Sequence, residues 1–333
     1  MSYKISVIIP IYKVEKYIDR CARSLFCQTM QDIEYIFVND CTPDDSVRLL
    51  QSVIDEYPKR KPYIKIISHE RNMGSGIVRN TGLAAAMAPY IIYCDSDDWV
   101  EPEMYEVMYK KACEENADIV MCDYYKEKKE KRIYCSQNPY NHKEDIIEQM
   151  LVGKIHSSVC GRLVRKSLYD DNSVRFPEGI NMWEDLVTSV QLHYFARKVS
   201  YISKPFYHYT QFNNSSLINT ISLKIVNDKI EGCMIIQSFF RKHELIEKYA
   251  IPLKRKMLMA KMDLATNYAL HDFARWKEIF PEINKDIMKM HIPLTMSLVC
   301  FLVDEEFYSL ALFCLFIKVQ INKIGKYCEK LVK

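Results

Sequence analysis

Several features that mark common protein classes are missing from this sequence of 333 residues. Its 12 cysteines form no CxxC pair and most lie in apolar runs, which indicates free thiols in a reducing compartment rather than disulfides. The net charge of +3 is too small to predict a nucleic-acid partner. No stretch of 18 uncharged apolar residues exists, so no membrane-spanning helix is expected.

Signals for secretion and for several enzyme classes are missing as well. Residues Met1–Ile5 run directly into a strand pattern without an apolar signal region, so we expect a cytoplasmic protein. The dinucleotide fingerprint GxGxxG, the phosphate loop GxxxxGK[ST] and a serine nucleophile elbow are all absent. The histidines show no metal-ligand spacing. These absences argue against a Rossmann oxidoreductase, a P-loop enzyme and a serine hydrolase.

Strand and helix patterns alternate over the first 125 residues. Runs that are apolar throughout indicate strands covered on both faces, and their alternation with helices predicts a Rossmann-like α/β fold with a mostly parallel sheet flanked by helices. The pattern becomes mixed up to residue 218, and from Ser222 it is helical only, which predicts an all-helical C-terminal extension. The predicted strands are Ile5–Pro10, Ile33–Val38, Ile64–Ile67, Tyr90–Tyr93 and Ile119–Cys122, and the predicted helices are Glu15–Gln28, Asp44–Tyr57, Gly76–Met87 and Pro102–Asn116.

Polar residues cluster directly after the first four predicted strands. In open α/β sheets the ligand binds beyond the carboxyl ends of the strands, so these residues are expected to meet at one site. They are Tyr12, Asn39-Asp40, Glu70–Asn72 and Asp95–Asp98.

Asp95–Asp98 (DSDD) is the sharpest of these features. Its three carboxylates would raise one another's pKa if left unpaired, and a bound divalent cation removes that penalty. Hard oxygen ligands suit Mg²⁺ or Mn²⁺, which would also take diphosphate oxygens. The alternative is an aspartate-rich turn that caps the helix beginning near Pro102.

Two other segments suggest contacts to a nucleotide. Asn72–Gly82 contains three glycines before a helix, and Arg79 within it could pair with phosphate, although a plain glycine-containing connection is the alternative. Asp40 could accept the N–H of a pyrimidine ring, or Asn39-Asp40 could simply start a turn.

A second acidic pair, Glu184-Asp185, follows Trp183 at the start of a predicted helix. A carboxylate here could serve as a general base. Because the helix dipole also favours acids at this position, capping of the helix is the alternative.

In combination, these segments resemble the family 2 glycosyltransferases, which have the GT-A fold. The resemblance runs from Ile5 to about Ser216 and leaves the last hundred residues outside it. It is carried by Ser6–Tyr12, Phe37–Asp44, Asn72–Gly82, Tyr93–Pro102, Phe176–Asp185, Tyr207–Tyr209 and Asn214–Ser216. It implies a catalytic domain at 1–218, with a nucleotide-binding half (1–125) and an acceptor half (126–218), and a helical region at 219–333.

The resemblance also implies a role for each motif residue. For the donor, it places Pro10 and Tyr12 beside the base, Asp40 at the uracil, Arg79 near the diphosphate, Asp95 at the ribose or metal, and Asp97 on the metal. Ser96 is a further donor-binding residue. For the acceptor, it makes Asp185 the catalytic base, with Trp183 and Glu184 shaping the acceptor site.

The implied function is an inverting transfer of a sugar from a nucleoside-diphosphate donor, UDP-linked, to an acceptor hydroxyl on a glycan or lipid-linked glycan. It implies Mn²⁺ or Mg²⁺ as cofactor and bacterial surface polysaccharide synthesis as the pathway. A catalytically silent nucleotide- or glycan-binding module on the same fold is the alternative.

The C-terminal tail allows two interpretations. Met290–Val303 and Phe307–Ile317 are free of charge apart from His291, and five lysines follow against one acid. An apolar helix followed by a basic one is typical of an in-plane anchor on the inner face of the cell membrane. Alternatively, the helices form a subdomain that packs on the catalytic domain, or a homodimer interface. The five lysines are Lys318, Lys323, Lys326, Lys330 and Lys333.

Overall fold

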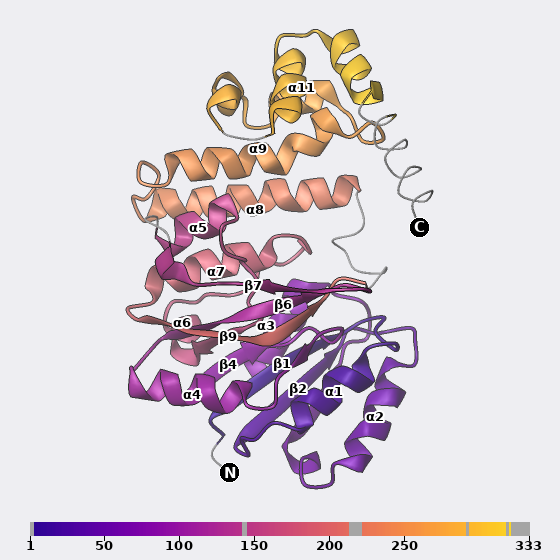
Figure 1. Cartoon of the computed structure of the whole chain (residues 1–333), viewed down its shortest axis with the longest axis vertical. Helices are drawn as coiled ribbons and strands as arrows, with labels where there is room; N and C mark the ends of the chain where they lie inside the picture. The colour runs from indigo at the N-terminus through magenta and orange to yellow at the C-terminus, as the bar shows by residue number, and fades with distance from the viewer. Residues whose placement is uncertain (1–2, 142–144, 213–221, 291–292, 318–319, 321–333) are drawn as a thin grey trace. The chain divides into compact units, whose positions relative to one another are not determined.

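The computed structural model of the chain describes residues 3–141, 145–212, 222–290, 293–317 and 320 (Figure 1). It divides into two compact units, Met1–Asn219 and Thr220–Lys333. The predicted domain boundary at 218–219, the motif Asn214–Ser216, His291 and the five C-terminal lysines lie outside the described residues.

The first unit is built on one mixed sheet with the strand order β3-β2-β1-β4-β8-β6-β9-β5 and with β7 paired to β6. The first four strands are parallel neighbours, and β6 and β9 are also parallel. β8 runs antiparallel between β4 and β6, so parallel pairing is less general than the sequence patterns indicated. The strands are β1 (Ile5–Ile11), β2 (Ile33–Asn39), β3 (Ile64–Ser68), β4 (Tyr90–Tyr93), β5 (Trp99–Val100), β6 (Ile119–Glu127), β7 (Arg132–Cys135), β8 (Arg162–Arg165) and β9 (Val199–Thr210).

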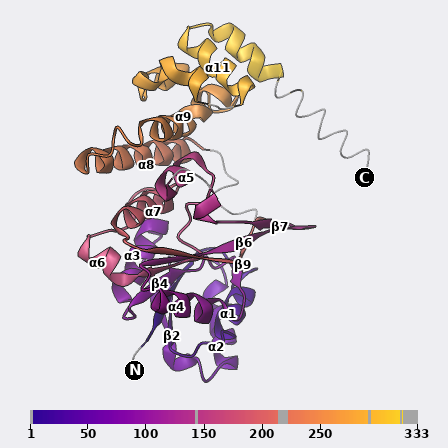
Figure 2. The same ribbon diagram turned by 60° about the vertical axis from the view of Figure 1, so that its left-hand side comes forward.

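Helices cover both faces of this sheet, which explains why its central strands are apolar throughout. Alternate residues of β1, such as Val7 and Ile9, join a core with α1, α2 and α4, whereas Ile8 faces α3. Figure 2 shows α4 on one side of the sheet and α7 on the other. The predicted α/β fold is confirmed. The helices are α1 (Ile18–Phe26), α2 (Ser46–Glu56), α3 (Ser75–Ala85), α4 (Met104–Glu114), α5 (Ile146–Val152), α6 (Lys166–Asp171) and α7 (Glu184–Phe195), with short 3₁₀ turns at Lys61–Tyr63 and Pro139–Asn141.

In the described residues the second unit is helical, as the sequence predicted. One lysine, Lys261, is fully buried in it and donates hydrogen bonds to the backbone oxygens of Trp276 and Ile279 and to Asn284 Oδ1. Its elements are α8 (Leu223–Lys242), α9 (Ala250–Thr266), α10 (Phe273–Glu278), the 3₁₀ segment Pro281–Lys289 and α11 (Leu294–Asp304), and residues 308–317 form a further helix. Within the described residues, no helix combines the length and the hydropathy needed to cross a bilayer.

The contact between α3 and β1 depends on Gly82. A Cβ at this position would lie 2.3 Å from Cγ2 of Ile8, closer than real Cβ atoms approach. Only Gly74 of the three glycines precedes α3, because Gly76 and Gly82 lie within the helix. We call residues 69–74 the glycine loop. Because α3 carries Arg79 and begins at the end of this loop, the close approach sets the position of both.

The variant Gly82→Ala therefore separates packing from helix propensity. Propensity alone predicts a gain of about 1 kcal/mol in the free energy of unfolding, whereas the clash with Ile8 predicts a loss of about 1–3 kcal/mol. We expect the loss, measured by urea denaturation. The control Ala84→Gly, at an exposed position of α3, gives the size of the propensity effect. A stabilised Gly82→Ala protein would contradict the close approach.

Candidate active site

The carboxyl ends of β1, β2 and β4 meet at one edge of the sheet, where the loops containing Asp40 and Asp95–Asp98 follow them. The glycine loop before α3 and the start of α7 reach the same edge: the backbone N–H of Ser75 donates to Asn181 Oδ1 at 2.9 Å. The structure thus brings together segments that are more than a hundred residues apart in sequence.

Arg79 is the centre of this site. It is buried, and its Nη1 donates to Glu184 Oε1 at 2.9 Å while its Nη2 donates to Asp95 Oδ1 at 3.0 Å. Asp185 Oδ1 lies 3.6 Å from Nη1. One guanidinium therefore holds carboxylates from both predicted acidic motifs. The sequence suggested phosphate as the partner of Arg79, and here it binds carboxylates.

Negative charge is crowded in this cluster. Burial, together with the neighbouring Asp185, raises the pKa of Glu184 to about 7 even though Arg79 opposes that shift. Burial likewise raises the pKa of Asp95 above its ordinary value against the pull of Arg79. Carboxyl groups with raised pKa values in such a cluster are typical of functional sites.

Asp185, the predicted catalytic base, lies beside Arg79 in the first turn of α7. Its side chain is 19% exposed, and its buried Oδ1 accepts no hydrogen bond from the described residues. Its Oδ2 accepts the backbone N–H of Val159 at 3.4 Å. The preceding Trp183, the N-cap residue of α7, has φ of 69°, a conformation that is strained for a bulky side chain and often occurs at functional sites.

The side chain of Asp40 binds the backbone of the glycine loop. It is 3% exposed and accepts hydrogen bonds from the backbone N–H groups of Met73 and Gly74, at 2.8 and 2.9 Å. Nδ1 of His69 lies 2.9 Å from Asp40 Oδ1. These three contacts give Asp40 a structural role in the loop, and its predicted contact with a uracil stays a prediction.

The three aspartates of the DSDD motif separate in the structure. Asp98 turns into the core, where Tyr207 Oη donates to it at 2.5 Å and the backbone N–H of Thr210 at 2.7 Å. Burial, with the nearby Asp97 and Asp95, raises the pKa of Asp98 well above its ordinary value. Only Asp95 and Asp97 remain as candidate metal ligands, and no group of three or more metal-ligating side chains occurs in the described residues.

The other predicted donor-site residues lie where β1 and β4 end. Pro10 belongs to β1 and is half-buried, whereas Tyr12 follows the strand and is exposed. Ser96 is buried within the acidic loop. The roles proposed for these residues toward a nucleotide stay predictions.

Two residues that were not predicted from the sequence, Ser75 and Asn181, connect the glycine loop with the segment before α7. Ser75 Oγ donates to Glu184 Oε1 at 2.9 Å, and Asn181 Oδ1 accepts the backbone N–H of Ser75. Both residues fall inside motifs that the sequence singled out, but their partners lie in a different motif. Only the three-dimensional fold shows that pairing.

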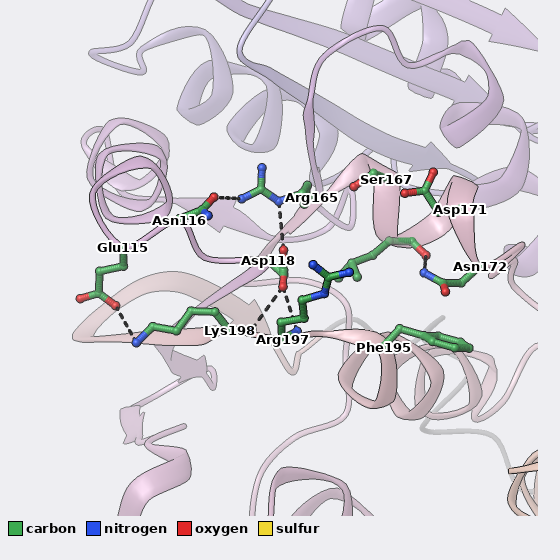
Figure 3. A pocket seen from close by; sticks show the side chains of 11 residues that line it. Glu115, Asn116, Asp118, Arg165, Ser167, Asp171, Asn172, Phe195, Arg197 and Lys198 are labelled. Atoms are coloured by element: carbon green, nitrogen blue, oxygen red, sulfur yellow. Dashed lines mark hydrogen bonds and ion pairs between the residues drawn. The ribbon is translucent and has the colours of Figure 1, made fainter.

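A separate pocket of about 740 Å³ lies near the starts of β6 and β9. Figure 3 shows the side chains that line it. Its charged side chains largely bind one another: Arg165 pairs with Asp118 at 3.0 Å, and Lys198 lies 3.9 Å from Glu115. None of the residues predicted for the site lines this pocket.

An α/β sheet of this topology, with an acidic loop after its fourth strand and an acidic pair at the start of a later helix, defines a glycosyltransferase of the GT-A class. The model of the family described as glycosyl transferase family 2 matches residues 6–172. EpsH of Bacillus subtilis, which is named as a glycosyltransferase, is 32% identical over 256 residues, covering 74% of this chain and 71% of EpsH. The chain therefore belongs to glycosyl transferase family 2.

Other similar proteins agree with this assignment. A poly(ribitol-phosphate) beta-glucosyltransferase of Bacillus spizizenii is 29% identical over 212 residues, which cover 62% of this chain and 32% of that protein. The crystal structure of residues 1–349 of S. aureus TarS in complex with UDP-GlcNAc matches with a TM-score of 0.63 at 18% identity, covering 92% of each chain. At that identity the match demonstrates a shared fold.

The buried cluster around Arg79 makes a prediction about stability. Replacing Arg79 with Leu leaves buried carboxylates without their partner, and we expect the free energy of unfolding to fall by about 3–5 kcal/mol. Urea denaturation measures the loss. The control Arg48→Leu removes an exposed pair with Asp45 and should leave the free energy of unfolding almost unchanged. Equal, small losses in the two variants would mean that Arg79 does not hold the cluster together.

Proposed function

We propose that this protein transfers a sugar from a UDP-linked donor to an acceptor hydroxyl with inversion at the anomeric carbon, in the synthesis of a bacterial surface polysaccharide. Membership of glycosyl transferase family 2 supports the reaction class. The UDP-GlcNAc complex of TarS supports the donor, and the name of the poly(ribitol-phosphate) beta-glucosyltransferase supports the pathway. We propose the cytoplasm as the site of the reaction, because the proposed donor is a nucleotide sugar.

The observation that carries this proposal is the meeting of Asp95 and Asp185 on the guanidinium of Arg79. Asp95 belongs to the proposed donor half and Asp185 to the proposed acceptor half. A group-transfer enzyme must hold donor and acceptor within reach of each other, because orientation of the reactants supplies much of the rate. A nucleotide-binding module without transfer activity has no need for that juxtaposition.

On the donor side, we propose that Pro10 and Tyr12 flank the base and that Asp40 reaches the uracil ring. Tyr12 has the exposed ring that such a contact requires. Ser96 would belong to the same donor-binding group. Arg79 would act near the diphosphate through the carboxylates that it orients, since its guanidinium is already paired with them.

Asp95 and Asp97 would hold a divalent cation of the Mg²⁺ or Mn²⁺ type. Both are partly exposed and carry hard carboxylate oxygens, and two protein ligands suit a cation whose remaining positions are filled by phosphate and water. When bound, such a cation would neutralise the charge that develops on the departing diphosphate. The fold positions these carboxylates in the loop that follows the carboxyl end of β4.

On the acceptor side, we propose that Asp185 removes the proton from the attacking hydroxyl, while Trp183 and Glu184 shape the acceptor site. Glu184 is already engaged, because its Oε1 accepts from both Arg79 and Ser75. It is therefore a poor candidate for a nucleophile that would form a covalent sugar intermediate. A single base and one displacement give inversion.

The first functional prediction concerns the base. Asp185→Asn keeps the shape of the side chain but removes its basicity, so we expect donor binding to persist and transfer to fall by on the order of 10²–10⁴-fold. A transfer assay with UDP-sugars, preceded by a thermal-shift screen of nucleotide sugars, measures both effects. The control Asp170→Asn changes an exposed aspartate and should leave the rate unchanged. A wild-type rate in Asp185→Asn would require another base, and no transfer or donor hydrolysis by the wild type would favour a silent binding module.

The second functional prediction concerns the metal. We expect wild-type protein to bind UDP more tightly in Mn²⁺ than in EDTA, and Asp97→Asn to lose that difference while its melting temperature without ligand stays the same. Calorimetric titration of UDP with and without Mn²⁺ measures it. Asp55→Asn, an exposed aspartate of α2, is the matched control. An unchanged metal effect in Asp97→Asn would rule out Asp97 as a ligand.

A further inference from the structure

Large apolar side chains are concentrated on the surface of one short part of the second unit. Eight of the 17 that are exposed in the described residues lie between residues 294 and 317. Exposed apolar groups of this density mark sites that contact another body, whereas scattered single ones need no explanation. The eight are Leu294, Leu298, Phe301, Phe307, Leu310, Phe313, Phe316 and Ile317.

On α11 these side chains form a stripe. Leu294, Leu298 and Phe301 stand at spacings of four and three residues, so they share one side of the helix, and they are 74, 47 and 42% exposed. The opposite side is packed, because Cys300 and Val303 are completely buried. The helix is thus anchored by one apolar side and presents a second apolar side to its surroundings.

The helix at 308–317 repeats this arrangement. Leu310, Phe313 and Ile317 stand at spacings of three and four residues and are exposed, whereas Ala311 and Leu315 are buried. Exposed apolar stripes on two successive helices are not needed for packing within this unit, because each helix already buries its other side.

The sequence directly after these stripes is basic. Residues 318–333 contain five lysines and one acid, Glu329. A second copy of the chain carries the same positive charge in this segment, so it offers the lysines no complementary partner. An anionic lipid surface, in contrast, accepts the apolar side chains into its interfacial region and attracts the lysines that follow.

We propose that residues 294–317 form a lipid-binding surface that lies in the plane of an anionic membrane, with the lysines of residues 318–333 strengthening its attachment. We name these two segments the apolar surface and the basic tail. In-plane binding needs no spanning segment, which agrees with the absence of a long apolar helix in the described residues. The proposal is independent of the sugar transferred, since its readout is attachment to lipid.

The test is flotation of the full chain with vesicles of phosphatidylcholine alone and with vesicles that also contain phosphatidylglycerol. We expect binding to the anionic vesicles, weakened by salt because the lysine contribution is electrostatic. The variant Leu298→Gln/Phe301→Gln/Phe313→Gln/Phe316→Gln should reduce the bound fraction by about tenfold or more, because it removes apolar groups from the interface. These positions are exposed, so the variant should keep its melting temperature.

Two further variants separate the contributions. Met87→Gln/Ile251→Gln removes exposed apolar side chains outside the apolar surface and should bind like wild type. Lys323→Gln/Lys326→Gln/Lys330→Gln should lose the preference for anionic vesicles and its salt dependence. Failure of the wild type to float with anionic vesicles overturns the proposal, as does equal flotation of the apolar-surface variant. A concentration-dependent dimer that becomes monomeric only in that variant, without vesicle binding by the wild type, would assign the surface to self-association.

Discussion

The ion cluster around Arg79 is the interaction on which the site depends. Asp95, Glu184 and Asp185 come from two motifs far apart in sequence, and each would be costly to bury alone. A single guanidinium with a fixed fork of donors can hold more than one carboxylate at once, which lysine cannot do with the same geometry. The cluster therefore fixes the start of α7 against the end of β4, and the site exists only when both are in place.

The glycine loop provides the second constraint, because it brings α3 and Arg79 to the cluster. Gly74 has φ of 90°, and a Cβ there would lie 2.5 Å from Asn181 Oδ1. Asp40 secures the same loop by accepting its backbone N–H groups. The loop is thus held from β2 on one side and from the segment before α7 on the other. The chain has few backbone conformations that satisfy both contacts.

The sequence predicted the parts of this structure that rest on local pattern. Ile5–Ile11 and Ile33–Asn39 are apolar throughout because helices cover both faces of the sheet, and that pattern is visible without the fold. The antiparallel β8 was not predicted, since its four residues carry no alternation and its neighbours β4 and β6 are remote in sequence. Position in the sheet is a tertiary property that periodicity does not encode.

The same limit applies to the site residues. The predicted topology placed them together at the ends of strands, but it did not predict the hydrogen-bond partner of each side chain. Asp98 looked equivalent to Asp95 and Asp97 in sequence, yet it turns inward because Tyr207 and the backbone of Thr210 offer it hydrogen bonds in the core. Composition shows which charges are present, and only the fold decides which of them are neutralised.

The charge balance of the cluster links its structure to its proposed chemistry. Burial raises the pKa values of Glu184 and Asp95, and repulsion from Asp185 raises them further, although Arg79 opposes both shifts. A second buried guanidinium, that of Arg162, also attracts Asp185. Uncompensated buried charge of this kind is unfavourable for stability. A cation bound beside Asp95 would reduce that repulsion. Under the proposed function, the same ion pairs that hold the start of α7 against the end of β4 would also keep Asp95 at the donor and Asp185 at the acceptor.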